Sequence, residues 1–271
     1  MTIKGNLKEV NIKLQEARIL LAFVLNKNKE YLVINEDYEL SCEEQEKFEQ
    51  AVMRLTDGEP LQHITGKQEF MGLEFIVNKD VLIPRADTEI LVEEVIDILN
   101  GMQKDVYILD LCTGSGAIAI SIAKYVENVE ILATDISEEA LCIAKKNYKD
   151  NSKIKFLQSD LFENIEEKFD LIVSNPPYIG KEEMEELDVE VKKEPVLALD
   201  GGPEGLDFYR RIISEAYKYL KPDGYLCLEI GYNQRESVIK LIEANGKYGN
   251  IYAKKDLAEN DRVVICRFYQ N

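Results

Sequence analysis

A short polar segment, Asn175-Pro176-Pro177-Tyr178, follows an apolar run that is typical of a buried strand. Neither proline has a backbone donor and each fixes φ near about −65°, so no regular element continues through them. The side-chain oxygen of Asn175 and the carbonyl of Pro176 can therefore act as two fixed acceptors, while Tyr178 can cover a flat group. Two such acceptors can hold both N–H bonds of a planar amide or aromatic amino group and favour a more tetrahedral, nucleophilic nitrogen. The alternative is a rigid turn or a proline-rich recognition segment.

Such a nitrogen could attack a sulfonium methyl group by in-line displacement. Positioning of the reactants is then the main contribution, worth up to about 7–11 kcal/mol. A strong general base is not required before attack, which fits a chain with one histidine, His63. No metal is expected either, because imidazole is scarce and the cysteines form no CxxC pair. The five cysteines are scattered and odd in number, which predicts reduced thiols: Cys42, Cys112, Cys142, Cys227 and Cys266.

A glycine-containing loop, "DLCTGSG", lies between a predicted strand and a predicted helix. Gly114, Ser115 and Gly116 allow a tight turn and close approach of a ligand, and the helix that follows offers free N–H groups. The spacing differs from the dinucleotide fingerprint, so a diphosphate is not indicated. Asp135, about 20 residues further on, can accept hydrogen bonds from two ribose hydroxyls. Together these features indicate a cofactor that contains adenosine; the alternatives are a plain turn and a helix start capped by Ser137.

The segment "SDLF" follows a third predicted strand. Asp160 could accept from an adenine amino group, while Leu161 and Phe162 could pack on the ring. Alternatively, Leu161 and Phe162 belong to the core.

These segments require a sheet that brings strand ends together. The pattern after residue 104 alternates strands and helices, which predicts an α/β fold with a mainly parallel sheet whose ligands bind at the carboxyl ends of the strands. The predicted strands are Val106–Leu111, Val129–Thr134, Ile154–Leu157, Phe169–Ser174, Tyr225–Ile230 and Val263–Phe268. The predicted helices are Ala117–Val126, Glu138–Asn147, Phe208–Leu220 and Gln234–Asn245.

The N-terminal third of the chain reads differently. Residues 1–66 predict a small helical domain, with one helix through "LKEVNIKLQEARILLAFVLN" and a second that opens on a Ser41/Glu44 capping box. Residues 67–85 predict a hairpin linker whose strands are Leu73–Val77 and Val81–Ile83. Residues 86–271 predict the catalytic domain, beginning with a helix that Asp87 or Thr88 caps and Gly101 ends.

Composition limits the class of protein. The chain has 271 residues, 45% of them apolar, and a formal net charge of −18. Such acidity makes a nucleic acid a less expected partner, although it does not exclude a local basic patch. No window reaches the roughly 20 apolar residues of a membrane span, and the N-terminus lacks a signal pattern, so a cytoplasmic protein without membrane contact is expected.

The order of the glycine loop, the acid and NPPY resembles Rossmann-like S-adenosylmethionine-dependent methyltransferases that modify planar nitrogens. More specifically, the chain resembles the HemK/PrmC-type peptide chain release factor glutamine methyltransferases from about residue 7 to its C-terminus. The segments that carry this resemblance are "EPLQHITGKQEFMGLEFIVNKDVLIPRADTEILV", "DLCTGSGAIAISIA", "SDLF", "FDLIVSNPPYI", "EPVLALDGGPEGLDFYR" and "LEIGYNQ".

The resemblance implies a seven-stranded, mostly parallel sheet and methylation of the side-chain amide nitrogen (N5) of the glutamine in the Gly-Gly-Gln loop of release factors. S-adenosylmethionine would be the methyl donor and S-adenosylhomocysteine the product. The first domain would dock the factor. The implied cofactor residues are Thr113, Gly114, Ser115, Gly116, Asp135, Leu161 and Asn175, and the implied glutamine site is Asn175, Pro176, Pro177 and Tyr178. Their place in the same loops adds Cys112 and Asp160 to the predicted cofactor site.

The chain departs from the family at Cys112, where the family commonly has glycine. If φ is positive there, the Cβ atom of Cys112 is expected to crowd the methionine end of the cofactor. Two other functions stay open at this point. An adenine-N6 methyltransferase for DNA or RNA would need a basic groove, and a cofactor-binding scaffold without catalysis would need no NPPY.

Overall fold

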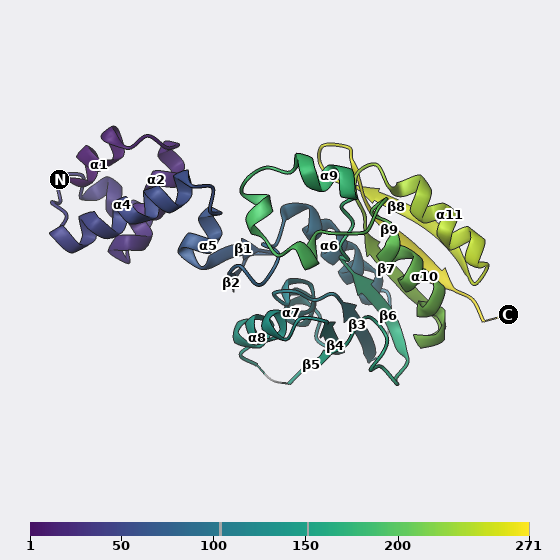
Figure 1. The fold of residues 1–271 in the computed structure, drawn as a ribbon. Coiled ribbons are helices and arrows are strands. Elements are labelled where there is room, and N and C mark those ends of the chain that lie inside the picture. The colour runs from purple at the N-terminus through teal and green to yellow at the C-terminus, as the bar shows by residue number, and fades with distance from the viewer. Residues whose placement is uncertain (103–104, 151, 271) are drawn as a thin grey trace. The chain divides into compact units, whose positions relative to one another are not determined.

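The computed structural model describes residues 1–102, 105–150 and 152–270, which form two compact units (Figure 1). One unit comprises Met1–Lys67 with Asp188–Lys193, and the other comprises Gln68–Leu187 with Glu194–Asn271. The predicted division into a docking domain, a linker and a methyltransferase domain concerns roles as well as boundaries and stays a prediction. Its last residue, 271, lies outside the described residues.

The smaller unit packs short helices around one apolar core (Figure 1). The Ser41/Glu44 capping box is present as predicted: the Ser41 hydroxyl accepts from the Glu44 backbone N–H at 3.2 Å, and the Glu44 carboxylate accepts from the Ser41 N–H at 2.8 Å. Leu20, Leu21 and Phe48 are buried at its centre. The elements are α1 (Ile3–Glu9), α2 (Leu14–Leu25), α3 (Lys29–Ile34), α4 (Cys42–Thr56), α5 (Leu61–Thr65) and the 3-10 turn η1 (Val191–Lys193).

The first predicted helix is wrong in its continuity, because α1 ends at Glu9 and α2 begins at Leu14. Val10 is extended, with φ −71° and ψ 138°, and ends α1. The residues between the helices include β-branched and amide side chains, which have modest helix propensity. The apolar periodicity therefore continues from one helix to the next, and it does not reveal that the helix is interrupted between them.

The predicted hairpin is also wrong in its register. Its strands are β1 (Lys67–Phe70) and β2 (Leu73–Ile76). Met71 and Gly72 have φ values of +50° and +67°, and two central residues with positive φ are the signature of a tight two-residue hairpin turn. Val81–Ile83 is a loop rather than a strand, and its first and last residues are buried. The backbone N–H of Ile83 donates to the Glu194 carboxylate at 2.9 Å instead of to a strand.

The larger unit contains a seven-stranded sheet in the order β5-β4-β3-β6-β7-β9-β8. The strands up to β7 pair in parallel, while β9 is antiparallel to both β7 and β8. The predicted fold class is therefore confirmed. The strands are β3 (Val106–Leu111), β4 (Val129–Asp135), β5 (Ile154–Gln158), β6 (Phe169–Ser174), β7 (Leu220–Glu229), β8 (Tyr248–Lys255) and β9 (Asp261–Phe268).

Helices cover both faces of this sheet. One apolar cluster joins the sheet to α6 (Ala86–Asn100), α7 (Ala117–Tyr125) and α8 (Glu138–Asn147). The other joins it to α10 (Asp207–Tyr219) and α11 (Arg235–Asn245) (Figure 1). The segment after β6 adds α9 (Lys181–Glu186) and the 3-10 turn η2 (Val196–Ala198).

The sequence missed β8 and placed one cap wrongly. Strand β8 lies at the sheet edge with alternating half-buried and exposed residues, so it has no apolar run to identify it. Helix α6 begins at Ala86 after Arg85 and has no side-chain cap, whereas Asp87 or Thr88 was predicted to cap it. Both residues lie inside the first turn, where they make tertiary contacts instead. Within the described parts of the chain, no helix combines the length and apolar character needed to cross a bilayer.

Candidate active site

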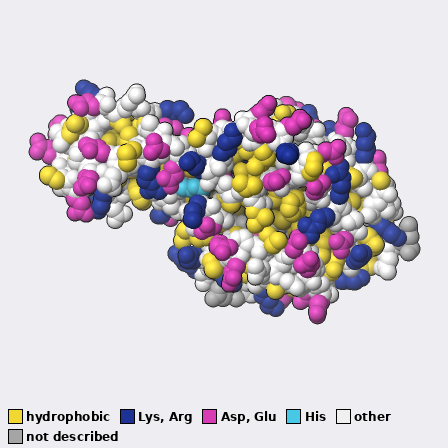
Figure 2. Space-filling view, viewed as in Figure 1, with side chains coloured by type: hydrophobic (Ala, Val, Ile, Leu, Met, Phe, Trp, Pro, Cys, Tyr) yellow, Lys and Arg dark blue, Asp and Glu magenta, His cyan; other side chains and the backbone are white. Residues whose placement is uncertain are grey.

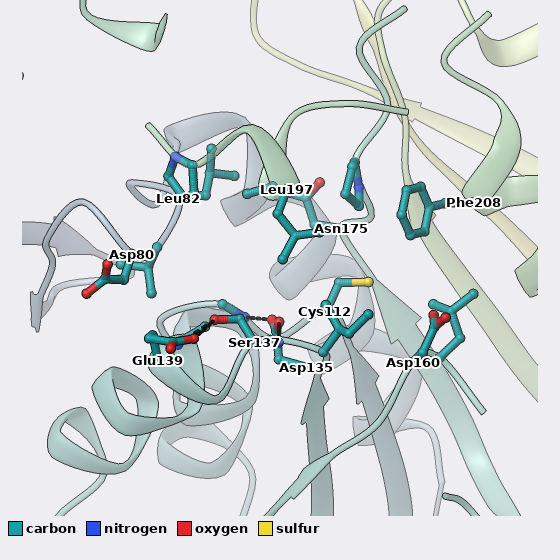
Figure 3. A pocket seen from close by; sticks show the side chains of 18 of the residues that line it. Asp80, Leu82, Cys112, Asp135, Ser137, Glu139, Asp160, Asn175, Leu197 and Phe208 are labelled. Atoms are coloured by element: carbon teal, nitrogen blue, oxygen red, sulfur yellow. Dashed lines mark hydrogen bonds between the residues drawn. The ribbon is translucent and has the colours of Figure 1, made fainter. Parts of the chain in front are cut away.

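The loops after β3 and β6 meet at the carboxyl end of the parallel strands. Strands β3 and β6 are neighbours, while β4 and β5 extend the sheet on the other side of β3. This is a topological switch point, where ligands bind in open α/β sheets. A cavity of about 480 Å³ opens at this end of the strands (Figure 3). In Figure 2, the face of the larger unit has a hollow, apolar area with acidic and basic side chains around it.

The cavity brings together seven of the residues that the sequence singled out. The predicted residues that line it are Cys112, Gly114, Asp135, Asp160, Leu161, Asn175 and Pro177. Five others do not line it: Thr113, Ser115, Gly116, Pro176 and Tyr178. The roles of all of them stay predictions.

The glycine loop is held by hydrogen bonds along the chain. The backbone N–H of Gly114 donates to the Asp135 carboxylate at 2.8 Å, and a Cβ at Gly114 would meet nothing within 4 Å. The backbone at Gly114 therefore lies open to the cavity. Gly116 serves packing instead, because its Cβ would lie 2.9 Å from Ile120 and 3.2 Å from the side chain of Ala144. Thr113 is buried, and its hydroxyl donates to the Asp110 carboxylate at 2.6 Å.

Cys112 has a φ of +59°, in the left-handed region that glycine adopts without cost. A residue with a Cβ atom stores roughly 1–2 kcal/mol of strain in this conformation. The Cys112 side chain lines the cavity, and burial raises the pKa of its thiol, so the thiol is neutral. Cys112 therefore holds a conformation that favours glycine, and its effect on the cofactor stays a prediction.

Asp135 ends β4 with both carboxylate oxygens oriented. One oxygen accepts from Gly114, and the other accepts from the backbone N–H of Ser137 at 2.9 Å. Burial raises its pKa from the ordinary value, while these backbone hydrogen bonds oppose the shift. The Ser137 hydroxyl caps α8 by accepting from Ala140 at 3.1 Å. Ser137, and not Asp135, therefore caps α8.

The loop after β5 combines a pocket wall with core. Leu161 is buried and also lines the cavity, with a φ of +49°. Phe162 is core, because its ring stacks on Tyr219 with centroids 4.7 Å apart. The Asp160 carboxylate pairs with Arg211 at 2.8 Å, and Arg211 also lines the cavity. Sequence reasoning missed Arg211, which lies on α10 about 50 residues from its partner.

The NPPY segment leaves β6 under close constraint. The Ser174 hydroxyl donates to the Leu111 carbonyl at 2.9 Å and ties the ends of β6 and β3 together. The Asn175 side-chain amide donates from Nδ2 to Thr88 Oγ1 at 3.2 Å. The Tyr178 carbonyl accepts from Gln234 Nε2 at 2.8 Å. Burial raises the pKa of the Tyr178 phenol, which is therefore neutral.

Two further groups lie around this segment, and of these the sequence analysis missed Glu229. Arg85 forms an ion pair with Glu194, which is buried, across more than 100 residues of sequence. Glu229, the last residue of β7, lies buried next to NPPY, and burial raises its pKa to about 7. The only signal for Glu229 was its place at a strand end, in the segment "LEIG".

Comparison with known proteins identifies the family. Residues 3–66 match the PrmC N-terminal domain, and residues 86–197 match the Methyltransferase small domain. A release factor glutamine methyltransferase of Clostridium acetobutylicum is 44% identical over 271 residues, covering 96% of this chain and 94% of that protein. The chain belongs to the release factor glutamine methyltransferase family. The resemblance predicted from the sequence motifs is confirmed.

Two more matches extend this finding. A bifunctional methyltransferase of Rickettsia felis is 42% identical over 281 residues, and the chain spans 53% of its length. A methyltransferase structure from Pyrococcus furiosus covers 74% of this chain and 90% of its own, with 21% identity and a TM-score of 0.53. The latter match shows the shared fold.

Proposed function

We propose that the protein transfers a methyl group from S-adenosylmethionine to the side-chain amide nitrogen (N5) of the glutamine in the Gly-Gly-Gln loop of peptide chain release factors. The observation that carries this proposal is Asn175, which lines the cavity at the switch point in a chain of this family. S-adenosylhomocysteine would be the product.

The residues of the cavity fit the cofactor. Asp135 presents an oriented carboxylate suited to ribose hydroxyls, and Gly114 leaves its backbone open. Leu161 and Phe208 supply apolar surface for a flat base. Cys112 and Asn175 would lie toward the methionine part. The sulfonium group, when bound, supplies an electrophilic methyl group.

The NPPY segment would hold the glutamine amide. With Nδ2 of Asn175 directed to Thr88, the amide oxygen of Asn175 can accept from the substrate nitrogen. The Pro176 carbonyl would accept the second N–H bond, and Pro177 and Tyr178 would limit the movement of the substrate. The prolines leave little backbone freedom to lose on binding. This residue set positions a weak nucleophile and leaves the proton to water.

The partner is a protein in this proposal. The smaller, helical unit would dock the release factor while the larger unit carries out the chemistry. The net charge of −18 supports a protein target over a bare nucleic acid. No direct contact with nucleic acid or membrane is part of the proposal.

A methylation assay read by peptide mass spectrometry tests it. The protein is mixed with S-adenosylmethionine and one of three substrates: unmodified release factor, the factor with its loop glutamine changed to alanine, or duplex DNA. Methyl on the glutamine peptide alone, absent with the alanine factor, is the expected result. Label on DNA with none on the factor would replace the proposal by adenine methylation, and no transfer to any substrate would favour a binding scaffold.

A further inference from the structure

Two buried polar side chains from distant parts of the chain lie against Asn175. Thr88 is in the first turn of α6, and Glu229 is the last residue of β7. Strands β6 and β7 are parallel and pair Ser174 with Leu228, so the residues that follow, Asn175 and Glu229, are neighbours. Thr88 is 4% exposed and Glu229 is 2% exposed. This depth is unusual for a carboxyl group, which is rarely fully buried unless it is paired.

The three side chains form one buried polar group. Asn175 Nδ2 donates to Thr88 Oγ1 at 3.2 Å. The Thr88 hydroxyl and the Asn175 amide both act on the Glu229 carboxyl group and favour its ionised form, against the effect of burial. Its second oxygen, Oε2, has no hydrogen-bond partner within the described part of the chain. A buried acceptor without a partner is destabilising, so stability alone gives no reason for this carboxyl group.

An ionised carboxylate accepts hydrogen bonds and donates none. Beside it, the Thr88 hydroxyl must donate inward, which leaves its lone pairs for the Nδ2 group of Asn175. The amide then has one permitted orientation, with Nδ2 inward and the oxygen toward the cavity. We propose that Glu229, acting with Thr88, is the positioning residue that fixes the Asn175 amide with its oxygen facing the substrate nitrogen.

The charged side chains around Glu229 do not neutralise it by an ion pair, so its carboxylate can act on Thr88 and Asn175. The charge of Asp87 on α6 raises the pKa of the Glu229 carboxyl group, and that of Arg262 on β9 lowers it. The Glu229 carboxylate in turn helps to raise the pKa of the Tyr178 and Tyr209 phenols. Arg262 does not form an ion pair with Glu229. It is held instead by two other acids, Asp87 at 2.9 Å and Asp256 at 2.8 Å.

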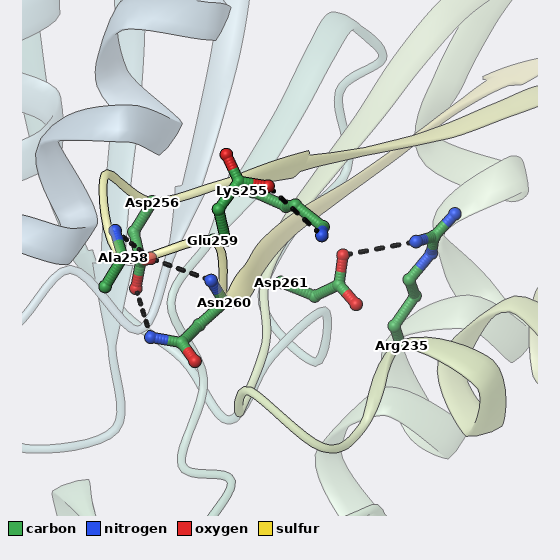
Figure 4. A network of polar contacts seen from close by, with 7 residues as sticks. All are labelled: Arg235, Lys255, Asp256, Ala258, Glu259, Asn260 and Asp261. Atoms are coloured by element: carbon green, nitrogen blue, oxygen red, sulfur yellow. Dashed lines mark hydrogen bonds and ion pairs between the residues drawn. The ribbon is translucent and has the colours of Figure 1, made fainter.

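Asp256 is itself fixed by the turn between β8 and β9. Its carboxylate accepts from the backbone N–H groups of Ala258 and Asn260, each at 2.8 Å (Figure 4). The Arg262 guanidinium is therefore held by Asp87 and Asp256, and it does not fully neutralise the charge of the Glu229 carboxylate.

This arrangement predicts a pH dependence. Burial raises the pKa of Glu229 to about 7, and the hydrogen bonds of Thr88 and Asn175 only partly oppose the shift. Above this pH the carboxylate enforces the amide orientation. Below it the protonated group can donate to Thr88, whose hydroxyl can then turn to the amide oxygen, and the unique orientation is lost. Turnover should therefore fall on the acid side with a midpoint near the pKa of Glu229.

The kinetic test rests on the proposed methyl transfer. Full-length wild-type protein and Glu229→Gln are compared for kcat, KM and pH profile with release factor as substrate. Glutamine has the same shape but can donate as well as accept, so kcat should fall about tenfold or more. The KM for S-adenosylmethionine should change little, and the acid limb near neutral pH should disappear. An unchanged limb in an active Glu229→Gln would overturn the proposal.

Two further sets of variants control for misfolding and for a second buried acid. If Glu229→Gln does not fold, Thr88→Val removes the bridging hydroxyl at nearly constant shape and should lower kcat, while Thr88→Ser should restore it. The matched control is Asp110→Asn, since burial also raises the pKa of Asp110 to about 7. Asp110→Asn should retain the acid limb. Loss of the limb in this variant, with retention in Glu229→Gln, would assign it to the cofactor loop and contradict the proposal.

A second measurement does not depend on catalysis. The side-chain amide resonances of Asn175, assigned by comparison with Asn175→Ala, are followed in ¹⁵N spectra across pH. They should titrate with a midpoint near neutral pH in the wild type and not in Glu229→Gln. If the wild type methylates nothing, the proposed function fails while this titration still decides the role of Glu229. Identical titration in both proteins would reject that role.

Discussion

The two strand ends at the switch point are built differently. The loop after β3 is held by its own backbone and by the next strand end, through Gly114 and Asp135. The segment after β6 is hydrogen-bonded to Thr88 of α6 and lies beside the buried Glu229 of β7. The first is a local structure with one strained residue, Cys112. The second is a buried polar cluster assembled from distant sequence.

The difference assigns separate tasks. A backbone cradle suits a cofactor that is bound and released intact, since it offers fixed N–H groups and space. A side chain locked by buried partners suits a group that must orient a weak nucleophile, where small displacements reduce the rate. Variants on the β3 side should therefore alter cofactor affinity, and variants on the β6 side should alter turnover.

The largest effect is expected at Asn175. In the proposed function, Asn175→Ala removes the acceptor for the substrate nitrogen and should lower kcat by roughly 100- to 1000-fold, the range seen when one preorganised polar contact is removed. Steady-state methylation of release factor measures this. The control, Asn233→Ala, removes an exposed amide that donates to Glu183 at 3.2 Å, and it should retain most activity. A loss in the control equal to that at Asn175 would contradict the assignment.

A smaller effect is expected at Asp135. Asp135→Asn keeps the shape but removes the negative charge and one acceptor, so affinity for S-adenosylmethionine should fall roughly tenfold or more. Isothermal titration calorimetry measures it. Unchanged affinity would show that the cofactor does not use this carboxylate.

Relief of strain at Cys112 should stabilise the protein. Cys112→Gly removes the Cβ atom at φ +59°, and the free energy of unfolding should rise by up to about 1 kcal/mol. The matched control is Cys142→Gly, in the middle of α8 and exposed, which should lose about 1 kcal/mol because glycine disfavours helix. Urea unfolding measures the change in stability of both variants. A loss of stability in both would contradict the strain at Cys112.

The smallest effect concerns the turn that braces Arg262. Although burial opposes ionisation, the hydrogen bonds from Arg262, Asn260 and Ala258 lower the pKa of Asp256 to about 2. A lowered carboxyl pKa gives stability that is present above about pH 4 and is lost as pH falls toward 2. The melting temperature of Asp256→Asn should lie below that of the wild type at neutral pH, and the difference between the two melting temperatures should become smaller in acid. Glu259→Gln on the same turn is the control, and a difference that is constant with pH would exclude the linkage.

Local elements around the loop after β3 were predicted better than the side chains that surround the segment after β6, for a physical reason. Most strands of the sheet and the Ser137 cap were predicted closely, because apolar runs and capping are local patterns. The hairpin register depended on positive φ at Met71, which no propensity signals. Thr88, Arg211 and Glu229 reach the site through tertiary pairing, and Thr88 was assigned to a helix cap instead. Family resemblance supplied the substrate, which residue chemistry alone left open between a glutamine and an adenine.

One paired measurement tests the comparison most directly. Asp135→Asn and Asn175→Ala are each examined for the Kd of S-adenosylmethionine and for the single-turnover rate of release-factor methylation at saturating cofactor. The expected result is a crossed pattern, in which Asp135→Asn loses mainly affinity and Asn175→Ala loses mainly rate. Equal loss of both quantities in both variants would contradict the division of tasks between the two strand ends.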